Sequence, residues 1–160
     1  MKKVNPEYTR AVLEIANRAP CLKLLSIKIC RLDYGYCKVE ADLNDTLNNP
    51  FGSLHGGMFS LILDTVTYWA LYCCIDEGYG ITTVDLQSNN LAAVNSGKII
   101  AEGRQIKVGR TLCLAKGTLK DESGKLLAYG TSKIFVAPGL QSIDQAVDKA
   151  GFETMPQRFL

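Results

Sequence analysis

Asp64 is the one formal charge in a largely apolar stretch of the sequence that runs from Gly56 to Ile75. An isolated ionised carboxylate is costly to bury, so an acid in such a segment must be paired, neutral or functional. His55, the only histidine of the chain, stands just before this stretch. The pattern therefore makes Asp64 the first candidate for a catalytic acid, base or nucleophile.

The segment before the apolar stretch indicates a loop that turns into a helix. It runs from Asn49 through Pro50 to His55, Gly56 and Gly57. The first peptide N–H groups of a helix have no intrahelical acceptor, so they are free to bind an anion or an oxyanion. The Gly56 N–H is the expected oxyanion donor, because glycine lets a substrate approach the backbone closely.

His55 and Asp64 cannot meet on a single helix. Nine residues advance about 13.5 Å and turn about 900°, which puts the two side chains on opposite sides at different heights. Two antiparallel helices related by a two-fold axis could bring Asp64 of one subunit towards the Gly56 turn of the other. This geometry predicts two equivalent sites shared between two chains.

Composition and charge fit one soluble domain. The 160 residues are 47% hydrophobic and 21% charged, which is enough to bury a core. A net charge of +2 does not indicate a nucleic-acid partner, and a span over 56–75 would leave Asp64 near the bilayer centre. Six cysteines without a C-x-x-C pair and a polar start of the chain predict a reducing cytoplasm. A single histidine and scattered thiols argue against a metal site, and no cofactor is expected.

Hydrophobic periodicity and turn residues predict an α+β fold. Asn5 and Pro6 are typical of a helix start, and a second, long helix covers 56–75. Strands are expected over 24–32, 36–43, 81–91, 98–108, 111–120 and 125–136. Gly109-Arg110 is expected to form a two-residue hairpin turn, and Asp121 to Gly124 a type I turn. A helix that is apolar on nearly every side must be enclosed, so a curved antiparallel sheet is expected to wrap around it.

The chain divides into three expected parts. Residues 1–19 hold an N-terminal helix, 20–137 form the main domain, and 138–160 are a C-terminal extension. Within the extension, Ser142 and Gln145 form a capping-box pattern and Gly151 could end a short helix. The extension is expected to lie on the outer sheet or to cover a neighbouring subunit.

At these spacings, Asn49, Gly52, His55-Gly56-Gly57 and Asp64 resemble the hotdog-fold acyl-CoA thioesterases of the phenylacetyl-CoA (PaaI-like) type. The resemblance covers about residues 20–137 and continues through 82–86 and 124–131. It implies a homodimer, often paired into a tetramer, that hydrolyses an acyl-CoA at its subunit interface. The sequence does not decide between a dimer and a tetramer.

The resemblance also implies roles for single residues. Asn49 would hold the thioester carbonyl or its water, and His55 would orient the loop or contact the leaving thiol. Asp64 would activate water or attack the carbonyl itself, and the sequence does not choose between these roles. Thr83 would position the water. Each also has a structural alternative, since Asn49 is a common turn former and Thr83 suits a strand.

The sequence gives weaker signals for substrate recognition than for the catalytic residues. Arg104, Lys107, Arg110 and Lys133 are candidates for the coenzyme A phosphates, although strand-edge cations usually serve solubility. The apolar helix favours medium, long or aromatic acyl groups over acetyl or succinyl groups. Relatives often carry arginine and proline where this chain has Leu91-Ala92-Ala93. Two other functions remain open: a hotdog hydratase or dehydratase, which usually needs a further histidine, and a non-catalytic acyl-CoA sensor.

Overall fold

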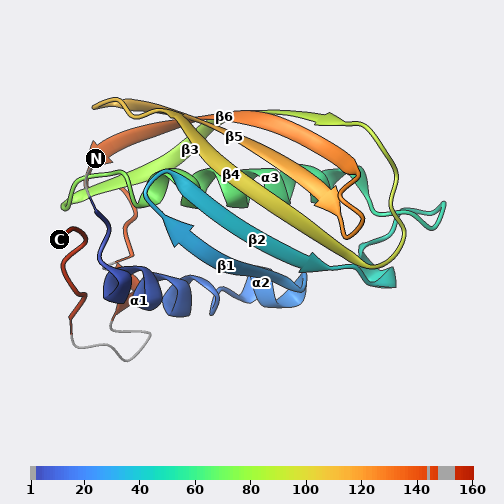
Figure 1. The fold of residues 1–160 in the computed structure, drawn as a ribbon, viewed down its shortest axis with the longest axis horizontal. Helices are drawn as coiled ribbons and strands as arrows, with labels where there is room; N and C mark the ends of the chain where they lie inside the picture. The colour runs from blue at the N-terminus through green and yellow to red at the C-terminus, as the bar shows by residue number, and fades with distance from the viewer. Residues whose placement is uncertain (1–2, 144, 148–153) are drawn as a thin grey trace.

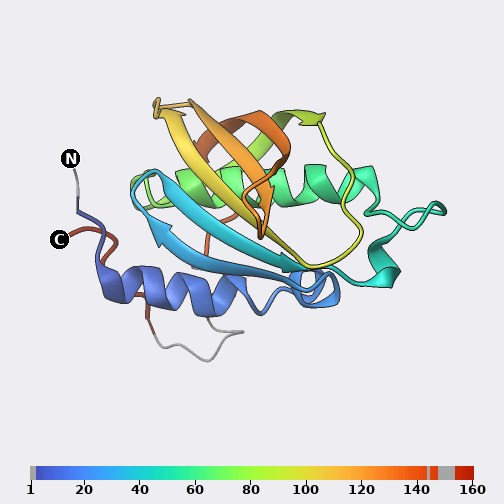
Figure 2. The same ribbon diagram turned by 45° about the vertical axis from the view of Figure 1, so that its right-hand side comes forward.

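A computed structural model describes residues 3–143, 145–147 and 154–160 of the chain. An antiparallel sheet with the strand order β1-β2-β4-β5-β6-β3 curves around one long helix, α3 (Figures 1 and 2). The strands are β1 (Ile27–Asp33), β2 (Tyr36–Asp42), β3 (Tyr79–Asn90), β4 (Lys98–Lys107), β5 (Leu112–Asp121) and β6 (Leu126–Pro138). The helices are α1 (Pro6–Ala16), α2 (Pro20–Leu24) and α3 (Gly56–Tyr72), with a 3-10 turn, η1, at Asp45–Leu47. This architecture confirms the predicted α+β hotdog fold.

Helix α3 lies in the concave side of the sheet and forms the centre of the core. Its residues Ile62, Leu63, Val66 and Leu71 are buried almost completely. They pack against inward-facing residues of the strands, which alternate with exposed ones along β5 and β6. None of the helices among the described residues is long and apolar enough to cross a membrane.

A row of glycines lets α3 approach the sheet closely. Gly103, Gly117 and Gly130 are direct neighbours across β4, β5 and β6. A Cβ atom at Gly103 would lie 2.2 Å from the carbonyl oxygen of Val66, and one at Gly117 would lie 3.0 Å from Leu63 Cδ2. The absence of side chains at these positions therefore fixes how deeply the helix sits.

The two edges of the sheet differ. At β1, the side chain of Asn17 donates to the Ile29 carbonyl and accepts from the Ile29 N–H, both at 2.9 Å, so it occupies the edge as another strand would. At β3, no strand of the described chain pairs with the outer edge. A bulge between Thr83 and Asp85 leaves Val84 58% exposed there. An open edge of this length is available for pairing with another chain.

Three local predictions were wrong. The strand predicted from Leu24 begins at Ile27 instead, because Pro20 starts the short helix α2, which ends at Leu24, and Ser26 has a positive φ of 55° before β1 begins. Helix α3 ends at Tyr72, earlier than expected. The predicted Gly109-Arg110 turn requires a positive φ at Gly109, which the structure does not have. A bulge between Gln105 and Lys107 changes the register, and the connection lengthens to 108–111.

The turns at Gly35 and Gly124 have positive φ values of 70° and 88°, and the Gly124 N–H donates to the Asp121 carbonyl at 3.0 Å, as expected for the predicted Asp121–Gly124 turn. Asn5 caps α1 as predicted, with its side chain accepting from the Glu7 N–H at 3.0 Å.

The two ends of the chain lie side by side (Figure 1). The Asn5 N–H donates to the Arg158 carbonyl at 2.9 Å, and the Leu160 N–H donates to the Lys3 carbonyl at 3.0 Å. Of the predicted helix in the extension, residues 145–147 are helical, whereas Gly151 lies outside the described residues. The boundaries of the three parts of the chain stay predictions.

We expect Gly103→Ala to lower the free energy of unfolding by about 1–3 kcal/mol, because the added methyl group overlaps backbone of α3 and cannot be accommodated by a rotamer change. Urea denaturation measures this. Gly117→Ala is the matched control, and its smaller cost follows from contacts at 3.0–3.2 Å with side-chain methyl groups that can shift. Equal stability of the Gly103→Ala variant and the wild type would contradict the close approach of α3.

Candidate active site

Asp64 lies in the middle of α3, where it is half-buried and has the one buried side-chain oxygen of the helix that lacks a hydrogen-bond partner in the described chain. Its Oδ1 atom is buried without a hydrogen bond, and no described cation pairs with it. The hydroxyls of Thr65 and Thr67 donate to the carbonyls four residues earlier, at 2.8 and 2.7 Å. Ser60 bonds Ser88 at 3.0 Å. A lone buried carboxylate oxygen is the kind of exception that requires a functional explanation.

The contacts between α3 and β3 locate what Asp64 faces. Asn90 Nδ2 lies 3.5 Å from the Gly56 carbonyl, Ser60 bonds Ser88, and the Tyr68 hydroxyl lies 3.4 Å from the Ile81 carbonyl. Helix and edge strand thus run in opposite directions. Asp64, midway between Ser60 and Tyr68, lies opposite the part of β3 that contains Thr83.

Thr83 is the second residue with an orphaned polar atom in this region. Its Oγ1 atom is buried and has no hydrogen-bond partner in the described part of the chain. An unpaired hydroxyl and an unpaired carboxylate on facing elements can together bind a water molecule or a polar group of a substrate.

Tyr68 lies one helical turn after Asp64. Burial is the main cause that raises the pKa of Tyr68 to about 12, and the negative charge of Asp64 adds to it. A side-chain hydrogen bond from Gln141 acts in the opposite direction. The Tyr68 hydroxyl therefore keeps its proton at neutral pH and remains a hydrogen-bond donor beside the candidate acid.

The turn at the start of α3 is held by His55. His55 is the N-cap, and its Nδ1 atom accepts from the Gly57 N–H at 3.0 Å, so Nε2 carries the proton of the neutral ring. The His55 N–H donates to the Leu47 carbonyl at 2.9 Å, which holds the turn against η1. Within the residues described, the Gly56 N–H has no acceptor. A free N–H at a helix N-terminus is suited to an oxyanion.

Asn49 holds the preceding loop. Its Oδ1 atom accepts from the N–H groups of Phe51 and Ser53, at 2.9 and 3.3 Å, and its Nδ2 atom donates to Ser53 Oγ at 3.1 Å. These bonds form a rigid turn that leaves Phe51 92% exposed. The structure therefore gives Asn49 a local structural role, and its predicted contact with a thioester carbonyl stays a prediction.

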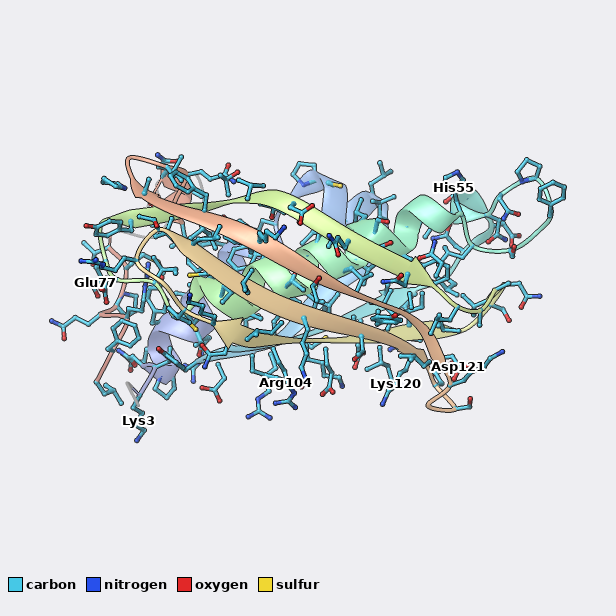
Figure 3. All side chains as sticks on the ribbon, turned by 90° about the horizontal axis from the view of Figure 1, so that it is seen from above. Lys3, His55, Glu77, Arg104, Lys120 and Asp121 are labelled. Atoms are coloured by element: carbon cyan, nitrogen blue, oxygen red, sulfur yellow. The ribbon has the colours of Figure 1, made fainter. Side chains whose placement is uncertain are left out.

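The structure groups some of the predicted site residues and separates others. Thr83 faces the segment of α3 that holds Asp64, whereas His55 and Gly56 lie at the N-terminal end of that helix (Figure 3). Gly56 and Asp64 of one chain are eight residues apart, or about 12 Å along the helix. One chain therefore provides a carboxylate and an N–H donor that do not face each other.

The four basic candidates lie away from Asp64. Arg104 is exposed on the outer face of the sheet, with its guanidinium 4.7 Å from the centre of the Tyr36 ring (Figure 3). Lys133 pairs with Asp85 at 3.0 Å on the same face. Lys107 is exposed at the end of β4, and Arg110 lines a cavity in the loop that follows. Their role in binding coenzyme A phosphates stays a prediction.

Tyr68 and Gln141 were not among the residues predicted for the site. Tyr68 could have been recognised from its spacing, because residues four apart share a face of a helix. Gln141 gives no such signal, since it reaches Tyr68 through the fold alone.

Comparisons with known proteins show similarity to thioesterases. Residues 51–128 match the family model described as the thioesterase superfamily. The proofreading thioesterase EntH of Klebsiella pneumoniae is 28% identical over 119 residues, which are 74% of this chain and 87% of that protein. Acyl-coenzyme A thioesterase 13 of Mus musculus is 29% identical over 96 residues, or 59% of this chain and 66% of that protein.

Solved structures show the same fold. A thioesterase from Haemophilus influenzae superposes with a TM-score of 0.78 at 23% identity, covering 88% of this chain and 98% of that one. Residues 51–128 of the chain thus resemble the thioesterase superfamily, and the chain has the hotdog fold.

We expect Asp64→Asn to fold normally and to have a free energy of unfolding equal to that of the wild type or up to about 2 kcal/mol higher, because it removes an uncompensated charge without changing shape. Chemical denaturation measures this. The control is Asp85→Asn, which loses the exposed ion pair with Lys133 and should cost less than about 1 kcal/mol. A clear loss of stability in Asp64→Asn alone would mean that the carboxylate is structural.

Proposed function

We propose that this thioester hydrolase acts on acyl-CoA, with a site built from two copies of the chain. The observation that carries the proposal is the unpaired carboxylate of Asp64 in an otherwise satisfied helix, together with a free N–H donor at Gly56 that the same chain cannot bring to it. Acyl-CoA as the substrate is supported by the mouse relative, whose name states that activity.

The open edge at β3 supports the homodimer. Pairing of two β3 edges across a two-fold axis would extend the sheet and lay the two α3 helices antiparallel. Asp64 of one subunit would then approach the Gly56 turn of the other, and each dimer would have two equivalent sites. Association of two such dimers into a tetramer would use the outer surface of the sheet and not the β3 edge.

The chemistry follows from the two groups. In hydrolysis, a water oxygen attacks the thioester carbonyl carbon, the carbon–sulfur bond breaks, and the products are a carboxylic acid and the coenzyme A thiol. Negative charge grows on the carbonyl oxygen as the carbon becomes tetrahedral, and the Gly56 N–H, already oriented by the His55 cap, stabilises it. In this proposal Thr83 holds the water, which is supported by its buried hydroxyl without a partner in the described chain.

Asp64 serves this reaction in one of two ways. As a general base it takes a proton from the attacking water. As a nucleophile it attacks the carbonyl carbon, releases the thiolate and forms an anhydride, which water then cleaves. Hydrolysis in water enriched with ¹⁸O under single-turnover conditions distinguishes them, because the anhydride route can place the label in the Asp64 carboxylate.

We expect Asp64→Asn to lose acyl-CoA hydrolysis by roughly 10²- to 10⁴-fold, because the amide neither accepts a proton nor attacks a carbonyl at neutral pH. The measurement is the release of free coenzyme A, followed with a thiol reagent, from octanoyl-CoA and phenylacetyl-CoA. Activity above a tenth of wild type would contradict the assigned role of Asp64. Binding of acyl-CoA by the wild type without any release would instead identify a sensor.

A complementation experiment tests the shared site. Gly56→Pro removes the N–H donor while suiting the first position of a helix, and the extended backbone of His55 tolerates a following proline. Gly56→Pro and Asp64→Asn should each be inactive alone. Hybrid dimers have one intact site, so a refolded equal mixture should regain about a quarter of the wild-type activity.

Mass spectrometry of the mixture serves as the control, since it must show the hybrid dimer. An inactive mixture that contains hybrid dimers, or an active monomer, would contradict the two-chain site.

A further inference from the structure

The segment 140–143, here called the strap, joins the end of the sheet to α3. It follows β6 after a turn at Gly139, whose φ is +76°. The strap passes so close to β3 that a Cβ atom on Gly80 would lie 2.4 Å from the carbonyl oxygens of both Leu140 and Gln141. Only glycine fits there, so the sequence of β3 accommodates the strap.

The strap reaches two tyrosines of α3. The side chain of Gln141 is near enough to the Tyr68 hydroxyl to lower its pKa, and the Ile143 N–H donates to the Tyr72 hydroxyl at 2.6 Å. Ile143 itself is buried. The strap therefore reaches α3 one and two helical turns beyond Asp64.

The far end of the extension contacts Tyr72 from another direction. The guanidinium of Arg158 is 2% exposed and lies 5.3 Å from the centre of the Tyr72 ring and 5.2 Å from that of Tyr8. It also donates to the Ile75 carbonyl just beyond α3. A buried cation between two rings and a carbonyl holds the extension firmly.

The strap reaches the C-terminal end of α3, where the helix carries aromatic side chains. Tyr68, Trp69 and Tyr72 form a cluster with ring centres 5.0–6.1 Å apart. In the other direction from Asp64, the contacts with β3 are polar, through Ser60 and Ser88. An apolar acyl group bound at Asp64 would therefore extend towards the aromatic rings and away from the serines.

We propose that the strap is the end wall of the acyl pocket and limits the length of the acyl group that the enzyme accepts. The proposal rests on the proposed hydrolysis at Asp64. Tyr72, where the strap is anchored, lies eight residues beyond Asp64, or about 12 Å along the helix, and this distance matches a medium acyl chain that extends along the aromatic side chains. The strap lies outside the residues 51–128 that match the family model, so this limit belongs to the extension of this chain.

Two variants displace the strap by different means. Gly80→Ala forces it away from β3 through the methyl group, and Gln141→Ala removes the side chain through which it acts on Tyr68. Gln87→Ala, on the exposed side of the same strand, is the matched control. The measurement is kcat/KM for acetyl-, butyryl-, octanoyl-, dodecanoyl- and palmitoyl-CoA, together with hydrogen exchange of the 140–143 amides.

In the wild type and in Gln87→Ala, we expect kcat/KM to rise up to octanoyl-CoA and to fall for longer chains. In Gly80→Ala and Gln141→Ala, the ratio of kcat/KM for palmitoyl-CoA to that for octanoyl-CoA should rise about tenfold or more, with faster exchange in the strap. Unchanged length profiles in both variants, with octanoyl-CoA still hydrolysed, would overturn the end wall. Failure of the wild type to hydrolyse any of these thioesters would overturn the proposed function itself.

Discussion

The close approach of α3 to the curved sheet is the constraint on which the rest of the structure depends. It is possible because Gly103, Gly117 and Gly130 carry no side chains where the helix lies nearest. The helix buries its apolar residues there and leaves a narrower face towards β3. The candidate residues Asp64 and Thr83 lie near that face, and His55 and Gly56 lie at the N-terminal end of the helix.

On the face of α3 near β3, two polar atoms lack hydrogen-bond partners in the described chain, and this has chemical consequences. Its hydroxyls are satisfied by helix carbonyls or by Ser88, whereas Asp64 Oδ1 and Thr83 Oγ1 lack partners in the described chain. The nearby edge of β3 is also unpaired, while the opposite edge at β1 is closed by Asn17. Orphaned polar groups beside an open strand are consistent with a surface that a second copy and a substrate complete.

The C-terminal extension adds a feature that the hotdog architecture does not require. It returns from β6 across Gly80, contacts Tyr68 and Tyr72, and ends with the buried Arg158 between aromatic rings. These contacts connect the last residues of the chain to the helix that carries Asp64. A substrate pocket on this helix would therefore be shaped partly by residues that lie outside the segment 51–128 matched by the family model.

The sequence by itself determined the fold class and the long apolar helix, and it indicated Asp64 as the candidate acid, because periodicity and an isolated charge are local signals. It also located the start of this helix at Gly56 and the turn at Gly124, whose residue types have few alternatives. Only the tertiary structure decided that Asn49 is occupied within its own loop, that Thr83 faces α3, and that Arg104 lies on the outer face of the sheet. It also decided the longer connection after β4 and the contact of Gln141 with Tyr68. These features depend on strand register, bulges and long-range packing, which no local pattern encodes.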